Sequence, residues 1–222
     1  MRIVDLSHRI VFPHWRWKPE RIVTSSHDNG ELFTSSRLHM PLHGFTHVDA
    51  PMHFLPGAEA IADLPLERWC GDAAVVDLSH RGADHGINAA DLQEHGQHIQ
   101  AGDIVLLRTD WDKKQDIGTR EFWTRGPYTT REAAEWLAAR NVKAVGYDYP
   151  PDEALRMNPE HSGSIPREYH ATHDVFFPRG IAVIEYLANL AGIGRPRTLF
   201  MALPLKVDGG DGAPVRAVAL EL

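Results

Sequence analysis

Three histidines and an aspartate cluster in a short stretch of this 222-residue chain. His43, His47, Asp49 and His53 follow one another at spacings of four, two and four residues. All three spacings are even, and residues an even number apart share a face of an extended chain. Imidazole and carboxylate groups together suit zinc and also harder ions such as manganese. The stretch therefore predicts a divalent metal site.

An extended strand explains this spacing better than a helix does. Position i+6 of a helix lies ~240° around the axis from position i, so Asp49 would leave the face that His43 and His47 share. Gly44 and Pro51 also disfavour a helix. We expect a strand that runs into a turn at Pro51.

His53 lies beyond that turn and need not be a metal ligand. A histidine beside a metal-bound water can shuttle its proton, a role worth ~10²–10⁴-fold in rate. The alternatives for His53 are a third ligand position and a purely structural role.

A metal held by one strand needs ligands from elsewhere in the chain. Glu185 ends an apolar run, 181–184, which predicts a buried strand, and it is the only carboxylate in the stretch 180–190. A carboxylate at a buried strand end needs a cation or hydrogen bonds to stay charged, and a salt bridge to an arginine is the alternative. Three histidines are candidates for the accompanying ligand: His161, His170 and His173.

The composition narrows the class of protein. Hydrophobic residues make up 43% and charged residues 24% of the chain, which is ordinary for a globular domain. The 30 acidic residues outnumber the 23 basic ones, so the basic surplus typical of nucleic-acid binders is absent. No apolar stretch approaches the ~18 residues of a membrane span. We expect a small-molecule substrate, with neither nucleic acid nor membrane as a partner.

Cysteine usage bears on the cellular compartment. The single cysteine, Cys70, cannot form an intrachain disulfide, which favours a reducing environment. Asp5 stands where a signal peptide would need its apolar stretch. We expect a cytoplasmic protein.

Strand-like and helix-like runs alternate in the middle of the chain and predict a single α/β domain. An Asp-Asn-Gly turn at 28–30 predicts a hairpin between 21–24 and 32–35. Asn88 is expected to cap a helix reaching His98, and Thr129 with Glu132 to begin another that stops at Asn141. Further strands are expected at 73–77, 104–108, 143–149, 181–184, 197–202 and 215–220.

Nearly the whole chain resembles the cyclase family of metal-dependent hydrolases, which includes bacterial kynurenine formamidases and isatin hydrolases. The specific motif is the histidine–aspartate stretch 43–54, which reads His-x-x-Thr-His-Val-Asp-Ala-Pro-x-His-Phe from His43. The order and spacing of further segments add to it: Asp5-Leu6-Ser7, 102–109, Gly146-Tyr147-Asp148, 203–206 and 212–216.

The resemblance implies a fold and a set of site residues. The fold would be a swivelling β/β/α domain with a mixed sheet core, spanning 1–222. His43, His47 and Asp49 would bind a first metal, with His53 as proton donor and acceptor. His173, twelve residues before Glu185, would help to hold a second metal bridged by Asp49 and Glu185. Either one or two ions, Zn²⁺ or Mn²⁺, and a homodimer or larger homo-oligomer fit the family.

The resemblance also directs attention to the substrate pocket. Trp17, or the nearby Trp15, matches a tryptophan that lines the formamidase pocket. Phe45 stands where the family usually has glycine, and we expect it to reshape the pocket wall or the backbone turn. The segment before His173 is roughly ten residues longer than in formamidases, and 153–170 is well placed to touch substrate.

Together with this resemblance, the residues predict a metal-dependent hydrolase that cleaves an amide, formamide or cyclic amide bond. A metal-bound hydroxide would attack and His53 would carry the proton. The chain lacks the Gly-x-Ser-x-Gly elbow of α/β-hydrolases. The alternatives are a lactonase or dehydratase using the same site, and a non-catalytic metal- or ligand-binding protein.

Overall fold

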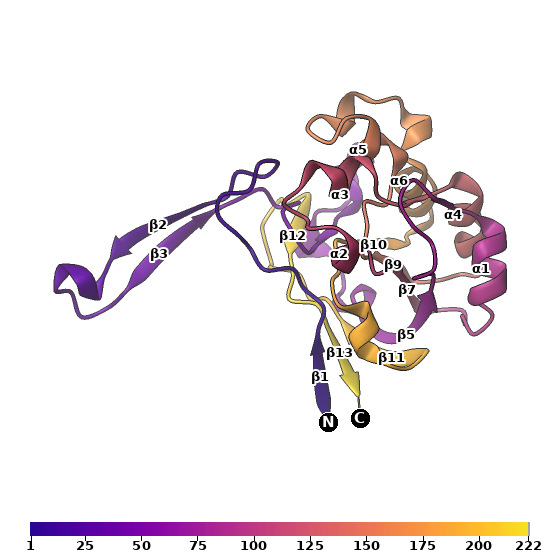
Figure 1. The fold of residues 1–222 in the computed structure, drawn as a ribbon, viewed down its shortest axis with the longest axis horizontal. Coiled ribbons are helices and arrows are strands. Elements are labelled where there is room, and N and C mark those ends of the chain that lie inside the picture. Colours follow the sequence, from indigo (N-terminus) through magenta and orange to yellow (C-terminus); the bar gives the residue numbers. More distant parts are fainter. Residues whose placement is uncertain (222) are drawn as a thin grey trace.

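A curled, mixed sheet of nine strands forms the centre of the computed structural model, which describes residues 1–221. Four neighbouring strands, β5, β7, β9 and β10, run parallel, and the strands on either side are antiparallel to them. The terminal strands β1 and β13 pair with each other, so the two ends of the chain lie side by side (Figure 1). The order across the sheet is β1 (Arg2–Asp5), β13 (Val218–Glu221), β11 (Arg197–Met201), β5 (Cys70–Asp77), β7 (Ile104–Arg108), β9 (Ala144–Tyr147), β10 (Ala182–Glu185), β4 (His47–Asp49) and β12 (Gly212–Pro214).

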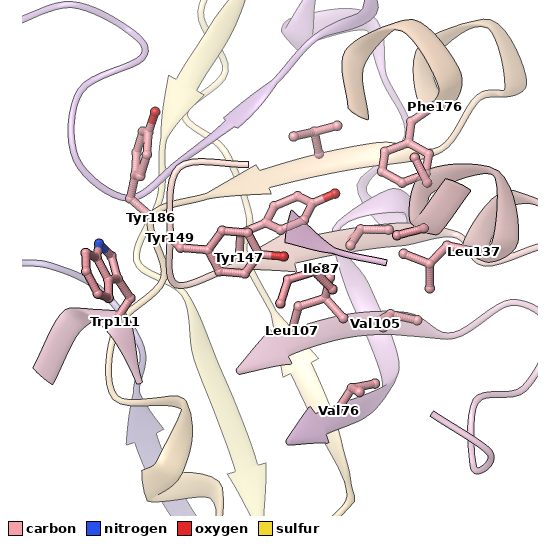
Figure 2. Close-up of a cluster of buried hydrophobic side chains, with 14 of the residues drawn as sticks. Val76, Ile87, Val105, Leu107, Trp111, Leu137, Tyr147, Tyr149, Phe176 and Tyr186 are labelled. Atoms are coloured by element: carbon pink, nitrogen blue, oxygen red, sulfur yellow. The ribbon is translucent and has the colours of Figure 1, made fainter. Parts of the chain in front are cut away.

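The parallel strands are buried on both faces, as their continuous apolar runs require. In β7, Val105 and Leu107 join the cluster that packs against the helices, whereas Ile104 and Leu106 join the cluster on the opposite face. Figure 2 shows Leu107, Ile87 and the Tyr147 ring together in the first of these clusters. The sheet therefore lies between two cores and provides a rigid frame for residues at its strand ends.

Six short α-helices lie within residues 1–221, and all except the fifth contribute side chains to the first core. They are α1 (Ala89–His95), α2 (Trp111–Lys114), α3 (Arg120–Thr124), α4 (Arg131–Ala138), α5 (Glu153–Met157) and α6 (Ala171–Phe176). Leu92 of α1, Leu137 of α4 and Phe176 of α6 are all buried in this core. Within residues 1–221, no helix has the length and apolar character needed to cross a membrane.

Two small sheets complete the fold. β6 (Gly86–Ile87) pairs in parallel with β8 (Tyr128–Thr129). β2 (Glu20–Ser25) and β3 (Ser35–His39) form an antiparallel hairpin that projects far from the body of the molecule (Figure 1).

The structure confirms the expected α/β domain with a mixed sheet and corrects several element boundaries. The hairpin forms, but its second strand is Ser35–His39 rather than 32–35. The helix capped by Asn88 ends at His95 because Gly96 follows. Thr130, not Thr129, caps the next helix by accepting a hydrogen bond from the Ala133 amide, and Thr129 belongs to β8.

Two further boundaries differ from the sequence-based expectation. The helix begun by Thr130 ends at Ala138, short of Asn141. Only the second half of the strand expected at 215–220 forms, as β13 from Val218 to Glu221, and β12 ends before it at Pro214.

Candidate active site

Two neighbouring strands bring three of the candidate ligands onto one face. β4 and β10 are antiparallel, and their register pairs His47 with Glu185. Asp49 lies two residues beyond His47 on the same strand, so its side chain shares that face. All three side chains are buried. The carboxyl end of β10 thus carries a cluster of two carboxylates and an imidazole.

The backbone that delivers His43 is a turn rather than the long strand expected from the even spacing. Only His47–Asp49 is extended, and Phe45 adopts a left-handed conformation with φ of 57°. The expected turn at Pro51 is present as a short 3-10 segment, Pro51–His53. The strand is shorter because the chain reverses direction around Gly44, whose amide bonds the Pro41 carbonyl.

His43 nevertheless reaches the cluster from this turn. Its Nδ1 lies 2.7 Å from Asp49 Oδ1 and its Nε2 lies 2.9 Å from Asp211 Oδ2. Burial alone would lower the pKa of His43, but Asp49 and Asp211 raise it to about 9. Gly212 makes room for the ring, because a Cβ there would lie 2.8 Å from His43 Cε1.

His47 is fixed in one tautomer by the backbone. Its Nδ1 lies 2.8 Å from the carbonyl oxygen of Phe45, which can only accept, so Nδ1 carries the proton. The other nitrogen, Nε2, lies 3.2 Å from Asp49 Oδ1 and 3.7 Å from Glu185 Oε2. His47 therefore presents an Nε2 lone pair to the two carboxylates.

His173 approaches the same carboxylates from α6. Its Nδ1 donates to Asp152 Oδ2 at 2.5 Å, which leaves Nε2 directed inward. Nε2 lies 3.3 Å from Asp49 Oδ2 and 3.7 Å from Glu185 Oε1. A carboxylate that holds the outer nitrogen of a histidine is the arrangement that commonly orients metal-binding histidines.

The carboxylate pair has the character of a cation site. Asp49 is fully buried, and its Oδ2 has no hydrogen-bond partner. Burial would raise the pKa of Asp49, but the surrounding histidines hold it well below its usual range. Burial, followed by the charge of Asp49, raises the pKa of Glu185. A divalent cation between the two carboxylates would relieve both the burial of charge and the repulsion.

One group of donor atoms with the required spacing combines His43, His53 and Asp211, and two more overlap in the cluster. His43, His47 and Asp49 offer atoms within 4.8 Å of one another, and so do Asp49, His53 and His173. Asp49 belongs to both groups. The donor set of imidazoles and carboxylates fits zinc or manganese, in one site or in two sites that share Asp49.

His53 lies at the edge of the cluster and keeps contact with solvent. Its ring centroid is 4.0 Å from that of His43, and its Nδ1 is 3.8 Å from Asp211 Oδ2, beyond hydrogen-bonding distance. Burial and the neighbouring His43 and His173 lower the pKa of His53 to about 4. The imidazole is therefore neutral and able to accept a proton.

A cavity of about 450 Å³ opens above these residues. The segment 153–170, singled out in the sequence for its length, forms much of one wall. It contributes Leu155, Ser162, Gly163, Ile165, Arg167 and His170. Phe54 and Tyr186 add aromatic surface.

Trp17 and Phe45 lie behind the cavity rather than on its wall. Both are buried, their ring centroids are 4.6 Å apart, and neither is among the lining residues. They pack with His14, whose ring is 4.6 Å from that of Trp17. Trp15 does not line the cavity either.

The two rival histidines occupy different positions. His170 lines the cavity, but its Nε2 bonds the Ser162 carbonyl at 3.1 Å. His161 is exposed and lies outside the lining. The structure thus brings His173 alone of the three into the carboxylate cluster.

Sequence reasoning missed several residues of this site. Asp152, Asp211, Tyr186 and Arg16 all contact the cluster or line the cavity. The Gly-Gly-Asp-Gly run around Asp211 is a weak signal, because such runs mark most turns. Arg16 carries no local signal, since its position depends on how the N-terminal segment folds over the sheet.

A buried cluster of histidines and carboxylates beneath a cavity, at the carboxyl end of parallel strands, is typical of metal-assisted enzymes. The chain belongs to the cyclase family: residues 4–153 match the sequence profile described as "Putative cyclase".

Individual relatives agree with this assignment. The chain is 31% identical over 195 residues to a kynurenine formamidase of Erythrobacter litoralis, covering 88% of this chain and 81% of that protein. Isatin hydrolase A from Ralstonia solanacearum superposes with a TM-score of 0.79 at 28% identity, covering 98% and 91% of the two chains. A predicted metal-dependent hydrolase from Bacillus stearothermophilus superposes with a TM-score of 0.73 at 27% identity, covering 98% and 97%.

Proposed function

We propose that this chain is a metal-dependent hydrolase that cleaves an amide, formamide or cyclic amide bond in a small molecule. The observation that carries the proposal is the pair of anchored histidines, His47 and His173, whose Nε2 atoms face Asp49 and Glu185. Relatives named kynurenine formamidase and isatin hydrolase support the choice of bond. We propose that residues 1–222 act as one catalytic domain.

The ligand roles follow from the donor atoms. His43, His47 and Asp49 would hold one cation, and His173 and Glu185 would hold a second that shares Asp49. When bound, a divalent metal lowers the pKa of a water molecule and so supplies hydroxide near neutral pH. Zn²⁺ is the first choice for this donor set, and Mn²⁺ is the alternative.

His53 would move the proton. Its Nδ1 faces Asp211 at 3.8 Å, so we assign the exchange to Nε2. The neutral ring accepts a proton from the attacking water and returns it to the leaving nitrogen. Asp211 would approach Nδ1 and stabilise the imidazolium during this exchange.

Chelation and a substrate panel test the proposal. Purified protein is expected to contain at least one divalent ion per chain, and removing it should abolish hydrolysis of formanilide or isatin because the nucleophile is lost. Adding Zn²⁺ or Mn²⁺ should restore the rate. Simple lactones serve as the comparison, since cleavage of lactones alone would favour the lactonase alternative. Full activity in metal-free protein would overturn the proposal.

We also propose that the molecule works as a homodimer or larger homo-oligomer. All five residues of β3 and five of the six of β2 are exposed, although Val23 and Leu38 are apolar. A two-stranded hairpin has little stability in water on its own. Contact with a second copy of the chain would bury the exposed apolar side chains of this hairpin.

A further inference from the structure

Two arginines line the catalytic cavity, and they differ in how their charge is satisfied. Arg167 pairs with Asp174 at 2.5 Å and lies over the Phe54 ring. Arg16 has no carboxylate within 4.0 Å among residues 1–221. Its Nε is buried and has no hydrogen-bond partner. The cavity therefore contains one arginine whose charge is unpaired.

Arg16 is held in place without using up its hydrogen-bond donors. The central carbon of its guanidinium lies 4.5 Å from the centroid of the Trp123 ring. Trp123 is fully buried and packs edge-on against Trp17 at 5.2 Å, so the platform itself is rigid. The amides of Arg16 and Trp17 both point at His14 Nδ1, at 3.2 and 3.4 Å, which fixes the turn that carries the arginine.

This charge lies close to the catalytic cluster. Tyr186 directly follows Glu185 and lines the same cavity as Arg16. His47, Asp49 and Glu185 line this cavity as well. A molecule that fills the cavity can therefore contact Glu185 and Arg16 together.

We propose that Arg16 binds a carboxylate on the substrate, so that the enzyme prefers anionic amides to neutral ones. The inference rests on the proposed hydrolase function and specifies the substrate class. A guanidinium stacked on an aromatic ring presents a planar fork that matches a carboxylate. An unpaired, partly buried cation is costly, and a substrate carboxylate is the partner that this cavity lacks.

A matched set of substrates provides the kinetic test. Formanilide and its 2-, 3- and 4-carboxylate derivatives share the same scissile bond and differ in whether, and at which ring position, they carry a carboxylate. The parent enzyme is expected to have a higher kcat/KM for at least one carboxylate isomer than for formanilide. Arg16→Gln should lower the ratio of these two kcat/KM values by ~10–100-fold, because a charge-assisted hydrogen bond is lost. Arg16→Lys should fall between the two.

Arg167→Gln is the matched control, because it removes the cavity cation that is already paired. It should leave the ratio of kcat/KM values within about twofold of the parent ratio. A ratio that falls with Arg167→Gln and not with Arg16→Gln would overturn the assignment.

A binding measurement separates this inference from the proposed function. Benzoate and benzamide have nearly the same shape and differ in charge, and their affinities can be measured by calorimetry without any turnover. The parent should bind benzoate more tightly, and Arg16→Gln should remove that preference while the melting temperature is retained. If benzoate selectivity depends on Arg16 but no amide is cleaved, only the hydrolase proposal fails. The role of Arg16 is refuted if amides are cleaved but neither Arg16→Gln nor Arg16→Lys changes the ratio of kcat/KM values or the preference for benzoate over benzamide.

Discussion

At the scale of single residues, the histidines of this site differ in which of their ring nitrogens already form hydrogen bonds. The Nδ1 atoms of His47 and His173 are bonded to Phe45 and Asp152, which leaves Nε2 of each for a ligand role. His53 has neither nitrogen in a hydrogen bond among residues 1–221, and it reaches the cavity surface. Under the proposed roles, the same type of side chain serves for binding in two places and for proton exchange in a third.

Alanine variants of His53 and His43 separate these roles. His53→Ala should retain the metal but lose ~10²–10⁴-fold in kcat, because only the proton path is removed. His43→Ala should lose metal as well as rate. Metal content by mass spectrometry, measured beside kcat, distinguishes the two outcomes.

Asp49→Ala is the control that should empty the site, since Asp49 contacts His43, His47 and His173. Loss of metal in His53→Ala would show instead that His53 is a ligand, and the proton shuttle would have to be another group.

At the scale of elements, the turn 43–46 is the least regular part of the site and the most dependent on packing. Phe45 has φ of 57° and is 1% exposed, in contact with the Trp17 ring. A non-glycine residue in this conformation is strained and persists because burial of the ring compensates. The turn also fixes the carbonyl that anchors His47.

Phe45→Gly is expected to lower the free energy of unfolding by roughly 2–4 kcal/mol, because the loss of a buried ring outweighs the relief of a left-handed backbone. Urea denaturation measures this change. Metal content should stay the same, because the anchoring carbonyl remains. The ratio of kcat/KM for an aryl formamide and isatin should shift as the wall behind the cavity relaxes. Unchanged ratios would show that Phe45 does not set specificity.

The elements themselves were predictable to different degrees. The strand at 104–108 matches β7 exactly in extent because its apolar run is bounded by polar residues on both sides. The helix α6, which carries His173, was not predicted, since 171–176 has no strong cap and gains its stability from burying Val175 and Phe176. His43 was identified correctly as lying near Asp49, but for a partly wrong reason, because a turn and not a strand delivers it.

Contacts between residues that lie far apart in the sequence could not be predicted at all. Asp211 is 168 residues from His43, and Asp152 is 21 residues from His173. Neither belongs to a periodic pattern that includes its partner. Their roles arise only when β12 pairs with β4 and when α6 packs onto the sheet.

At the scale of the whole molecule, the hairpin formed by β2 and β3 projects from the body of the protein and stays exposed. The register pairs Arg21 with Leu38 and Val23 with Ser36, which places Val23 and Leu38 on one face. These side chains are 50% and 53% exposed. Exposed apolar residues on a projecting hairpin are typical of a contact between subunits.

Lysine at both positions, Val23→Lys with Leu38→Lys, should shift the proposed homo-oligomer toward monomer at micromolar concentration, because charge on that face opposes its burial. Sedimentation velocity measures the change. Arg37→Glu alters charge on the opposite face and should leave the sedimentation coefficient unchanged. A double variant that sediments like the parent would place the subunit contact elsewhere.

The hydrogen bond between Asp152 and His173 has a consequence for how this enzyme can diversify. It joins the two residues at the ends of the segment 152–173, so that the chain between them leaves the scaffold and returns to it at neighbouring positions. Because the closure entropy of a loop grows only slowly with its length, residues can be inserted or exchanged there at little thermodynamic cost. We therefore expect changes in this segment to alter the cavity wall while the positions of His173, Asp49 and Glu185 are kept.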